Sequence, residues 1–127
     1  MQEKRLFEYA VIRVVPRVER EEFLNIGVIV FCASQKFLQL KFNLDENRLL
    51  CLYEKFDMEE VKEYLKAIKY ICAGGKEGGT IGELPIASRF RWLTAARSTI
   101  VQASKVHPGF CDDPEETLER LYCELVL

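Results

Sequence analysis

The chain has 127 residues, of which 49% are hydrophobic and 30% are charged, and its formal net charge is -2. This length and composition are typical of one folded domain, expected over residues 1–127, and exclude a disordered chain. No apolar run approaches the roughly 20 residues of a membrane-spanning helix, and the N-terminus lacks the apolar core of a signal peptide. We therefore expect a cytoplasmic protein without a membrane partner, and the overall charge does not favour nucleic acid.

Five cysteines are spread along the chain without a CxxC pair, and the sequence holds a single histidine. A zinc site would have to gather its ligands from distant segments, so small buried thiols in a reducing compartment are the simpler interpretation. We accordingly expect neither a metal nor another cofactor.

The first third of the chain predicts an antiparallel meander of strands. Residues 6–15 are rich in β-branched and aromatic side chains, and residues 23–32 are the most apolar strand. Gly27 within the second strand predicts a bulge or a close backbone approach. Residues 37–44 alternate apolar and polar side chains, which indicates a strand with one solvated face. The short connections favour antiparallel pairing of the three strands.

Acidic caps, helical spacing of apolar residues and boundary prolines or glycines mark the helices. They predict helices over residues 45–53, 57–73, 85–96 and 113–125. Residues 98–103 are a fourth strand candidate, and residues 106–111 resemble a loop. The glycine-rich segment 74–82 lacks the GxxxxGK[ST] spacing and follows a helix, so a surface loop is favoured over a phosphate loop.

These elements together predict an α+β protein. Its sheet should have three to four strands in a mainly antiparallel arrangement, with helices packed mostly on one face. A chain with several strands followed by several helices is typical of this class, and no repeat or linker divides the sequence.

The most unusual stretch is Arg89–His107, which holds the only tryptophan and the only histidine. Residues 84–111 carry four Lys/Arg and no Asp/Glu, whereas residues 112–127 carry one Arg and six acids. Arginine binds phosphate or carboxylate in a bidentate manner, and tryptophan stacks on bases. The candidate anion- or partner-binding residues are Arg13, Arg89, Arg91, Trp92, Arg97, Ser98, Thr99, Lys105 and His107.

A structural interpretation of the same residues stands beside this hypothesis. The arginines would then pair with the acidic C-terminal helix, and Trp92 would belong to the core. Arg13, in the middle of an apolar strand, either binds an anion or reaches solvent near the end of the strand.

Catalytic patterns are weak. His107 precedes Pro108 and Gly109 in the expected loop, where it is a candidate general acid or base, and Cys111 is four residues away. No Ser/His/Asp spacing supports a triad, and the acids form no metal-binding motif. We name no catalytic residue, and the sequence favours a protein that is not an enzyme.

The runs YAVIRVVP, EFLNIGVIVF, RFRWLTAARSTIVQ and VHPGFCDDP resemble a bacterial family catalogued as domain of unknown function 3037. The resemblance extends from about Glu8 to Leu125. It implies a small bacterial protein without an assigned activity, so no catalytic residue is carried over. It also implies a protein partner, because members are encoded beside kinases similar to the HipA toxin family.

Three functional hypotheses follow. The first is a non-enzymatic interaction or accessory module, with a HipA-like kinase as its partner. The second is an anion- or nucleic-acid-binding protein that uses residues 89–107. The third is a small enzyme that uses His107.

Overall fold

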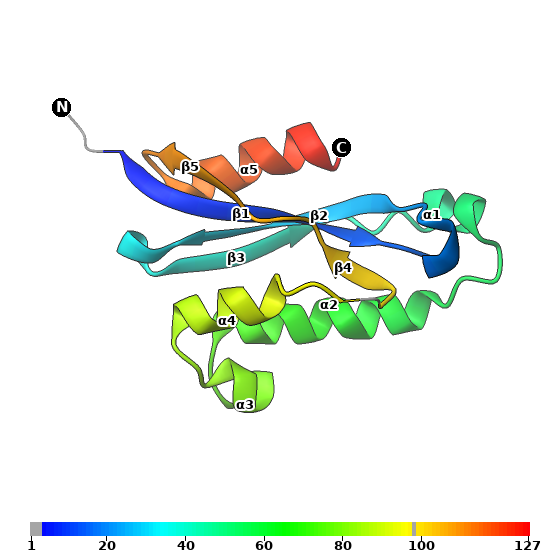
Figure 1. The fold of residues 1–127 in the computed structure, drawn as a ribbon, viewed down its shortest axis with the longest axis horizontal. Coiled ribbons are helices and arrows are strands. Elements are labelled where there is room, and N and C mark those ends of the chain that lie inside the picture. Colours follow the sequence, from blue (N-terminus) through cyan, green and yellow to red (C-terminus); the bar gives the residue numbers. More distant parts are fainter. Residues whose placement is uncertain (1–3, 98) are drawn as a thin grey trace.

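The computed structural model describes residues 4–97 and 99–127. Over these residues the strands are β1 (Arg5–Val14), β2 (Leu24–Cys32), β3 (Phe37–Phe42), β4 (Val101–Ala103) and β5 (His107–Cys111). The helices are α1 (Glu46–Leu52), α2 (Met58–Ala73), α3 (Gly79–Gly82), α4 (Ile86–Leu93) and α5 (Pro114–Leu125). The strands form one antiparallel sheet, with α5 on one side and α2 and α4 on the other (Figure 1). The expected α+β class is confirmed.

The strands are ordered β3-β2-β1, and both β4 and β5 lie along the outer edge of β1. β1 pairs with β2 and β2 pairs with β3 in antiparallel fashion, which confirms the predicted meander. β4 pairs with Ile12–Val14, and β5 pairs with Arg5–Tyr9. β1 is therefore an interior strand, as expected from a sequence that is largely apolar on both sides.

Ser104 connects the two outer strands across a break in their pairing with β1. Its main-chain N–H donates to the Val11 carbonyl at 2.8 Å, and its hydroxyl accepts a hydrogen bond from the Val11 N–H, also at 2.8 Å. Val11 thus keeps both main-chain hydrogen bonds although neither outer strand pairs with it. Residues 101–111 consequently form one kinked edge of the sheet.

Gly27 lies where β2 is bulged and pressed against β3. The register between β2 and β1 slips between Ile12 and Arg13. A Cβ atom at Gly27 would stand 2.9 Å from the Lys41 carbonyl oxygen and 2.9 Å from the Phe42 Cβ. Both predicted reasons for this glycine, a bulge and a close backbone approach, are confirmed.

The predicted helix caps are also confirmed. The side chains of Asp45, Asp57 and Asp113 each accept a hydrogen bond from a main-chain N–H in the first turn of α1, α2 and α5. α4 follows Pro85 as expected but ends at Leu93 instead of continuing to residue 96. The helix ends earlier because the residues after Leu93 turn the chain toward β4, which lies on the opposite edge of the sheet from β3.

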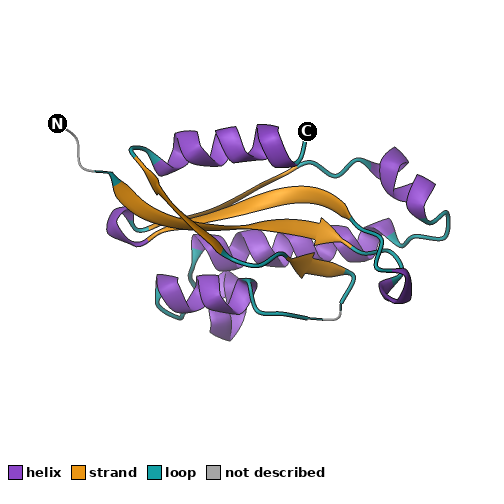
Figure 2. Cartoon of the chain, turned by 45° about the horizontal axis from the view of Figure 1, so that its top comes forward, coloured by secondary structure: helices purple, strands orange, loops and turns teal. Residues whose placement is uncertain are grey.

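Each face of the sheet carries its own apolar core. Helices lie on both faces of the sheet (Figure 2). In the larger core, the fully buried Phe90 of α4 stacks on Phe31 of β2 with ring centroids 5.0 Å apart, beside Leu65 of α2. In the smaller core, Leu118 and Leu121 of α5 pack on the opposite side of β2. Because α1, α2 and α4 all contribute to the larger core, the helices lie mostly on one face, as predicted.

Three segments differ from the sequence-based expectation. Residues 107–111 form β5 instead of a loop, because Gly109 lets the backbone lie against Phe7; a Cβ there would stand 2.7 Å from the Phe7 Cε1. The segment 74–82 contains the one-turn helix α3. The side of β3 expected to face solvent is partly covered by α5. Lys41 on this side forms an ion pair with Glu119 of α5 at 2.5 Å.

Candidate functional site

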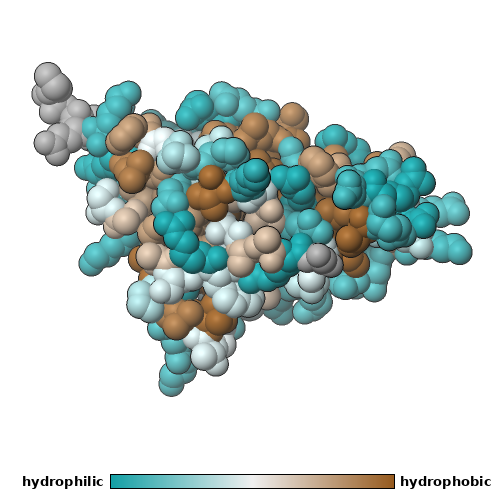
Figure 3. All heavy atoms as spheres, viewed as in Figure 1, coloured by the Kyte–Doolittle hydropathy of each residue, from teal (hydrophilic) through white to brown (hydrophobic). Residues whose placement is uncertain are grey.

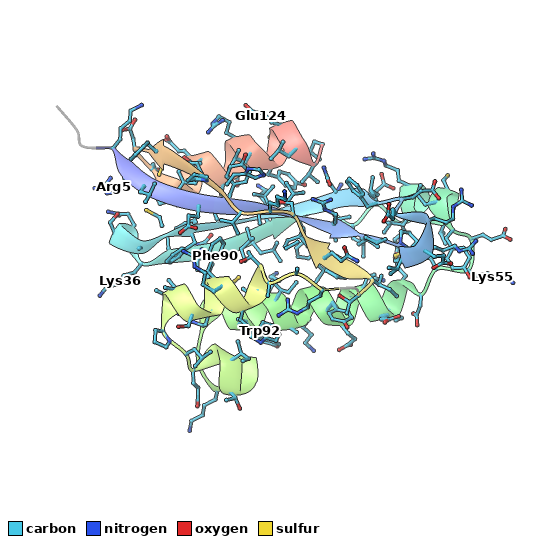
Figure 4. The ribbon with its side chains drawn as sticks, in the orientation of Figure 1. Arg5, Lys36, Lys55, Phe90, Trp92 and Glu124 are labelled. Carbon is cyan, nitrogen blue, oxygen red and sulfur yellow. The ribbon has the colours of Figure 1, made fainter. Side chains whose placement is uncertain are left out.

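The basic segment 89–107 begins in α4, crosses a loop and enters β4 and β5. Residues two positions apart lie on roughly opposite sides of a helix. In α4, Phe90 therefore points toward the sheet and Trp92 points away from it (Figure 4). Phe90 is completely buried, and Trp92 is 41% exposed. Trp92 is therefore not the core residue that the structural interpretation expected.

Arg89 fixes the end of α2 to α4. Its guanidinium donates to the carbonyls of Ile71 at 2.8 Å and Cys72 at 2.9 Å, and its Nε donates to the Leu84 carbonyl at 3.0 Å. The carbonyls of the last helical turn lack partners within the helix, and they carry the negative end of the helix dipole. The charge of Arg89 is thus engaged by the fold.

Arg91 fixes α4 to the sheet. It forms a bidentate ion pair with Glu8 of β1, with N–O distances of 2.7 and 2.8 Å. The hydrogen bond that it donates to Glu8 raises the pKa of the Arg91 guanidinium. The expectation that the acidic C-terminal helix neutralises these arginines is wrong here, because α5 lies on the opposite face of the sheet (Figure 1).

Arg97 has a different environment. Its guanidinium carbon lies 4.2 Å from the centroid of the Trp92 ring, and one of its nitrogens donates to the Trp92 carbonyl. Among residues 4–97 and 99–127, no carboxylate forms an ion pair with it. Arg97 therefore presents a charge that the described part of the chain does not neutralise.

An apolar groove opens beside this Trp92–Arg97 pair, with a volume of about 140 Å³. Its walls come from α2, from the end of α4 with the loop that follows, and from β4, and Ile12 of β1 forms its base. Trp92 and Tyr64 at its rim are 41% and 39% exposed. The main lining residues are Tyr64, Ile68, Ile71, Trp92, Leu93 and Arg97. We call this the Trp92 groove.

The other predicted residues are dispersed. Thr99 lines the Trp92 groove, and its hydroxyl donates to the Val101 carbonyl at 2.7 Å, so it shapes the entry to β4. Ser98 lies outside the described residues. Lys105 is exposed in the kink between β4 and β5. His107 is exposed on β5, where its ring contacts Tyr9 at a centroid distance of 5.3 Å.

Arg13 belongs to the other side of the sheet, shared with α5. Its guanidinium carbon lies 4.3 Å from the centroid of the Phe23 ring, and its Nε is buried without a hydrogen-bond partner in the described chain. The sheet separates it from α4. The structure therefore does not bring Arg13, Arg89, Arg91 and Arg97 into one pocket.

Thiol chemistry at this site is not supported. His107 and Cys111 stand at opposite ends of β5, about 13 Å apart at the rise of an extended strand, so they form no catalytic pair. Burial raises the pKa of the Cys111 thiol, and burial also raises the pKa of Cys72 to about 12. Both thiols thus stay protonated near neutral pH, where a nucleophile would need the thiolate.

Within the described residues there is neither a cluster of metal-binding side chains nor a membrane-spanning helix. Across residues 4–97 and 99–127, no three His, Cys, Asp or Glu side chains gather to hold a metal ion. No helix in this part of the chain has the length and apolarity to cross a bilayer. What the geometry offers is a small apolar groove with an aromatic rim and one unneutralised cation.

The fold and the groove together define an α+β protein with a small apolar surface groove. On the face of the molecule seen in Figure 3, apolar side chains lie in patches among hydrophilic ones. The model of the family described as "Protein of unknown function (DUF3037)" matches residues 9–126, and the chain belongs to this family. The match confirms the resemblance carried by the four sequence runs. No curated protein and no solved structure matches the chain.

Sequence reasoning missed half of the groove. Tyr64, Ile68 and Ile71 recur at helical spacing on α2, which predicts a face that packs on the sheet. In the structure this face meets the end of α4 only partly, and Tyr64 remains 39% exposed. A tyrosine at the margin of an apolar stripe is the only local signal that this face continues to the surface.

Proposed function

We propose that this protein is a non-enzymatic interaction module that holds a side chain of a partner protein in the Trp92 groove. The observation that carries the proposal is the joint presence of an apolar hollow, two partly exposed aromatic rings and Arg97. Tryptophan, tyrosine and arginine are the residues enriched at the energetic centres of protein interfaces.

The size of the groove suits one apolar anchor. Its volume of about 140 Å³ is close to that of an apolar cavity able to hold a benzene ring, so a leucine or phenylalanine side chain would fit. Arg97 at the rim would pair with a carboxylate next to this anchor, a geometry that the planar guanidinium favours. The partner segment therefore combines an apolar side chain with a neighbouring acid.

The other two hypotheses have less support. Anion or nucleic-acid binding through residues 89–107 would need several free cations, but Arg89 and Arg91 are already bonded within the fold. An enzyme that uses His107 would need a second catalytic group, and the nearest one expected, Cys111, lies at the other end of β5.

As the partner we propose a kinase similar to the HipA toxin family, following the implication of the family resemblance. Trp92 is the only tryptophan, so labelling it biosynthetically with 5-fluorotryptophan gives a fluorine signal that reports on the groove alone. Adding an unlabelled kinase similar to the HipA toxin family should shift this signal at saturating concentrations. A kinase that binds without shifting it would exclude the groove as the site.

Two tyrosines of α2 provide a matched control. Tyr64 lines the groove and Tyr70 does not, and their exposed fractions are 39% and 37%. Tyr64→Ala should weaken kinase binding about tenfold or more, as for an interface anchor, while Tyr70→Ala leaves it unchanged. Calorimetric titration measures both, and an equal loss in the two variants would argue against the groove.

A further inference from the structure

β3 is an unpaired edge of the sheet. It pairs with β2 on one side, and no other strand of the described residues pairs with it. The N–H of Asn43, directly after β3, donates to Ile26 of β2 at 2.8 Å. Because main-chain groups alternate in direction along a strand, those of Leu38, Leu40 and Phe42 point away from β2. This edge can accept another strand by main-chain hydrogen bonds.

Two hollows follow this edge where β3 meets α2. One lies beside residues 35–40 and the other beside Phe42 and Leu44, each with a volume of about 520 Å³. Lys69 lines both of them, so the two hollows adjoin along this edge, and together we call them the β3 channel. Apolar side chains of β3 and of α4, including Ile86, form part of its wall.

Lysines give the β3 channel a positive charge. Lys62, Lys66 and Lys69 recur on one side of α2 and line the channel, and Lys36 lies at its other end. Lys62 is paired with Glu46 at 3.2 Å. In contrast, no carboxylate of residues 4–97 and 99–127 pairs with Lys36, Lys66 or Lys69. The Nζ of Lys69 lies 5.6 Å from the centroid of the Phe42 ring, close to the strand edge.

This charge distinguishes between occupants. A second copy of the chain, paired edge to edge through β3, would bring two rows of lysines together, and like charges oppose that contact. A strand with acidic side chains on one side would instead place them beside Lys66 and Lys69. Its other side would face α5, whose Glu119 is close to β3, so acids are not favoured there.

We infer that the β3 channel binds an extended segment of a partner protein, which adds to the sheet as a further strand beside β3. Acidic residues at alternate positions of that segment lie over the lysines of α2. This inference does not depend on the Trp92 groove, which opens on a different side of α2 and shares no lining residue with the β3 channel.

A synthetic strand tests the inference directly. The probe is a fluorescein-labelled peptide of about eight residues that alternates threonine and glutamate, long enough to pair with β3. Fluorescence anisotropy should show saturable binding to the full-length protein. A peptide that alternates threonine and lysine should not bind. Equal binding of the two peptides, or no binding of the acidic one at low salt, would overturn the inference.

A second peptide separates strand addition from simple charge attraction. Methylating the alternate amide nitrogens of the threonine-glutamate peptide keeps its charge but removes donors needed for pairing with β3. We expect this peptide to bind at least tenfold more weakly. If it binds as well as its parent, or if a single-stranded oligonucleotide displaces the parent peptide at equal concentration, the surface is an anion-binding patch and the inference is wrong.

Variants of the protein locate the site. Lys69→Glu should raise the dissociation constant of the acidic peptide about tenfold, since it replaces an attraction by a repulsion. Lys55→Glu makes the same change of charge at a lysine that lines neither hollow of the β3 channel and lies at the opposite end of the molecule from Lys36 (Figure 4), so it should have no effect. Trp92→Ala should also leave peptide binding unchanged, so a failure of the Trp92 groove would be recognised separately. Equal weakening by Lys55→Glu would place the peptide elsewhere.

Discussion

Arg91 and Arg97 are six residues apart, yet they serve different purposes. Arg91 forms a bidentate ion pair with Glu8 of β1, which neutralises its charge. The guanidinium carbon of Arg97 lies over the Trp92 ring at the rim of a groove, and Arg97 has no carboxylate partner in the described chain. The helical half of the basic segment, with Arg89 and Arg91, thus holds the fold together, and the half that follows α4 presents a surface.

The difference shows that a dense basic segment is not by itself a binding site. Its net charge of +4 over residues 84–111 suggested one anion site, but the fold supplies carbonyl and carboxylate partners to the first two arginines. Which arginines remain free to bind a partner depends on which carbonyl and carboxylate groups of the fold lie within hydrogen-bonding distance of them. Substitutions of Arg89 and Arg91 should therefore affect stability, whereas substitution of Arg97 should affect binding.

The largest effect is expected at Phe90, two residues before Trp92. Phe90→Ala should lower the free energy of unfolding by about 3–5 kcal/mol, because it leaves a cavity between α4 and Phe31. Trp92→Ala, at a site that is 41% exposed, should cost no more than about 1 kcal/mol. Urea denaturation followed by circular dichroism measures both. Similar losses would mean that Trp92 also supports the core.

Arg89→Ala should come next. It removes three hydrogen bonds from a charged donor to main-chain carbonyls, and we expect a loss of about 1.5–3 kcal/mol. Arg89→Lys should recover little of it, because a single ammonium cannot reach three carbonyls that a planar fork spans. Full recovery by lysine would show that only the charge at the end of α2 matters.

Arg91→Ala should have a smaller effect, below about 1 kcal/mol, because the Arg91 side chain is 57% exposed. The loss should shrink further in concentrated salt, which screens exposed ion pairs. A double-mutant cycle with Glu8→Gln isolates the interaction. A coupling energy that does not respond to salt would indicate a role for Glu8 beyond this pair.

The smallest effect on stability belongs to Arg97. Arg97→Ala should change the free energy of unfolding by less than about 0.5 kcal/mol, as is typical of surface positions. It should nevertheless weaken binding of the proposed kinase partner, and Arg97→Lys should only partly restore it. Denaturation measures the stability of these variants, and calorimetric titration measures their binding of the kinase. A strongly destabilised Arg97→Ala would show that Arg97 stabilises the fold, as Arg89 and Arg91 do.

Most of the fold was readable from local patterns. Alternating and continuous apolar runs identified β1, β2 and β3, and the acid caps located the starts of α1, α2 and α5. β5 was not predicted, because Pro108 and Gly109 are residues of loops by every local rule. Pro108 is tolerated because β5 is an edge strand. Gly109 is required because the Phe7 ring leaves no room for a side chain at this position.

The candidate site was less predictable. The sequence pointed to Trp92 and Arg97, but it did not separate them from Arg89 and Arg91. The partners of these two arginines include Cys72, 17 residues from Arg89, and Glu8, 83 residues from Arg91. The β3 channel gave no signal at all, since its lysines look like the solvated side of an amphipathic helix. Such sites depend on which elements the fold places side by side.

The position of β1 has a consequence for folding during synthesis. On one side β1 pairs with β2, which begins ten residues after β1 ends, but its outer edge is paired only by residues 101–111. Until these residues leave the ribosome, the N-terminal strand carries an uncovered edge, and the α5 side of the sheet is also bare. Nascent chains arrested before residue 100 should therefore bind chaperones and aggregate more readily than the finished protein.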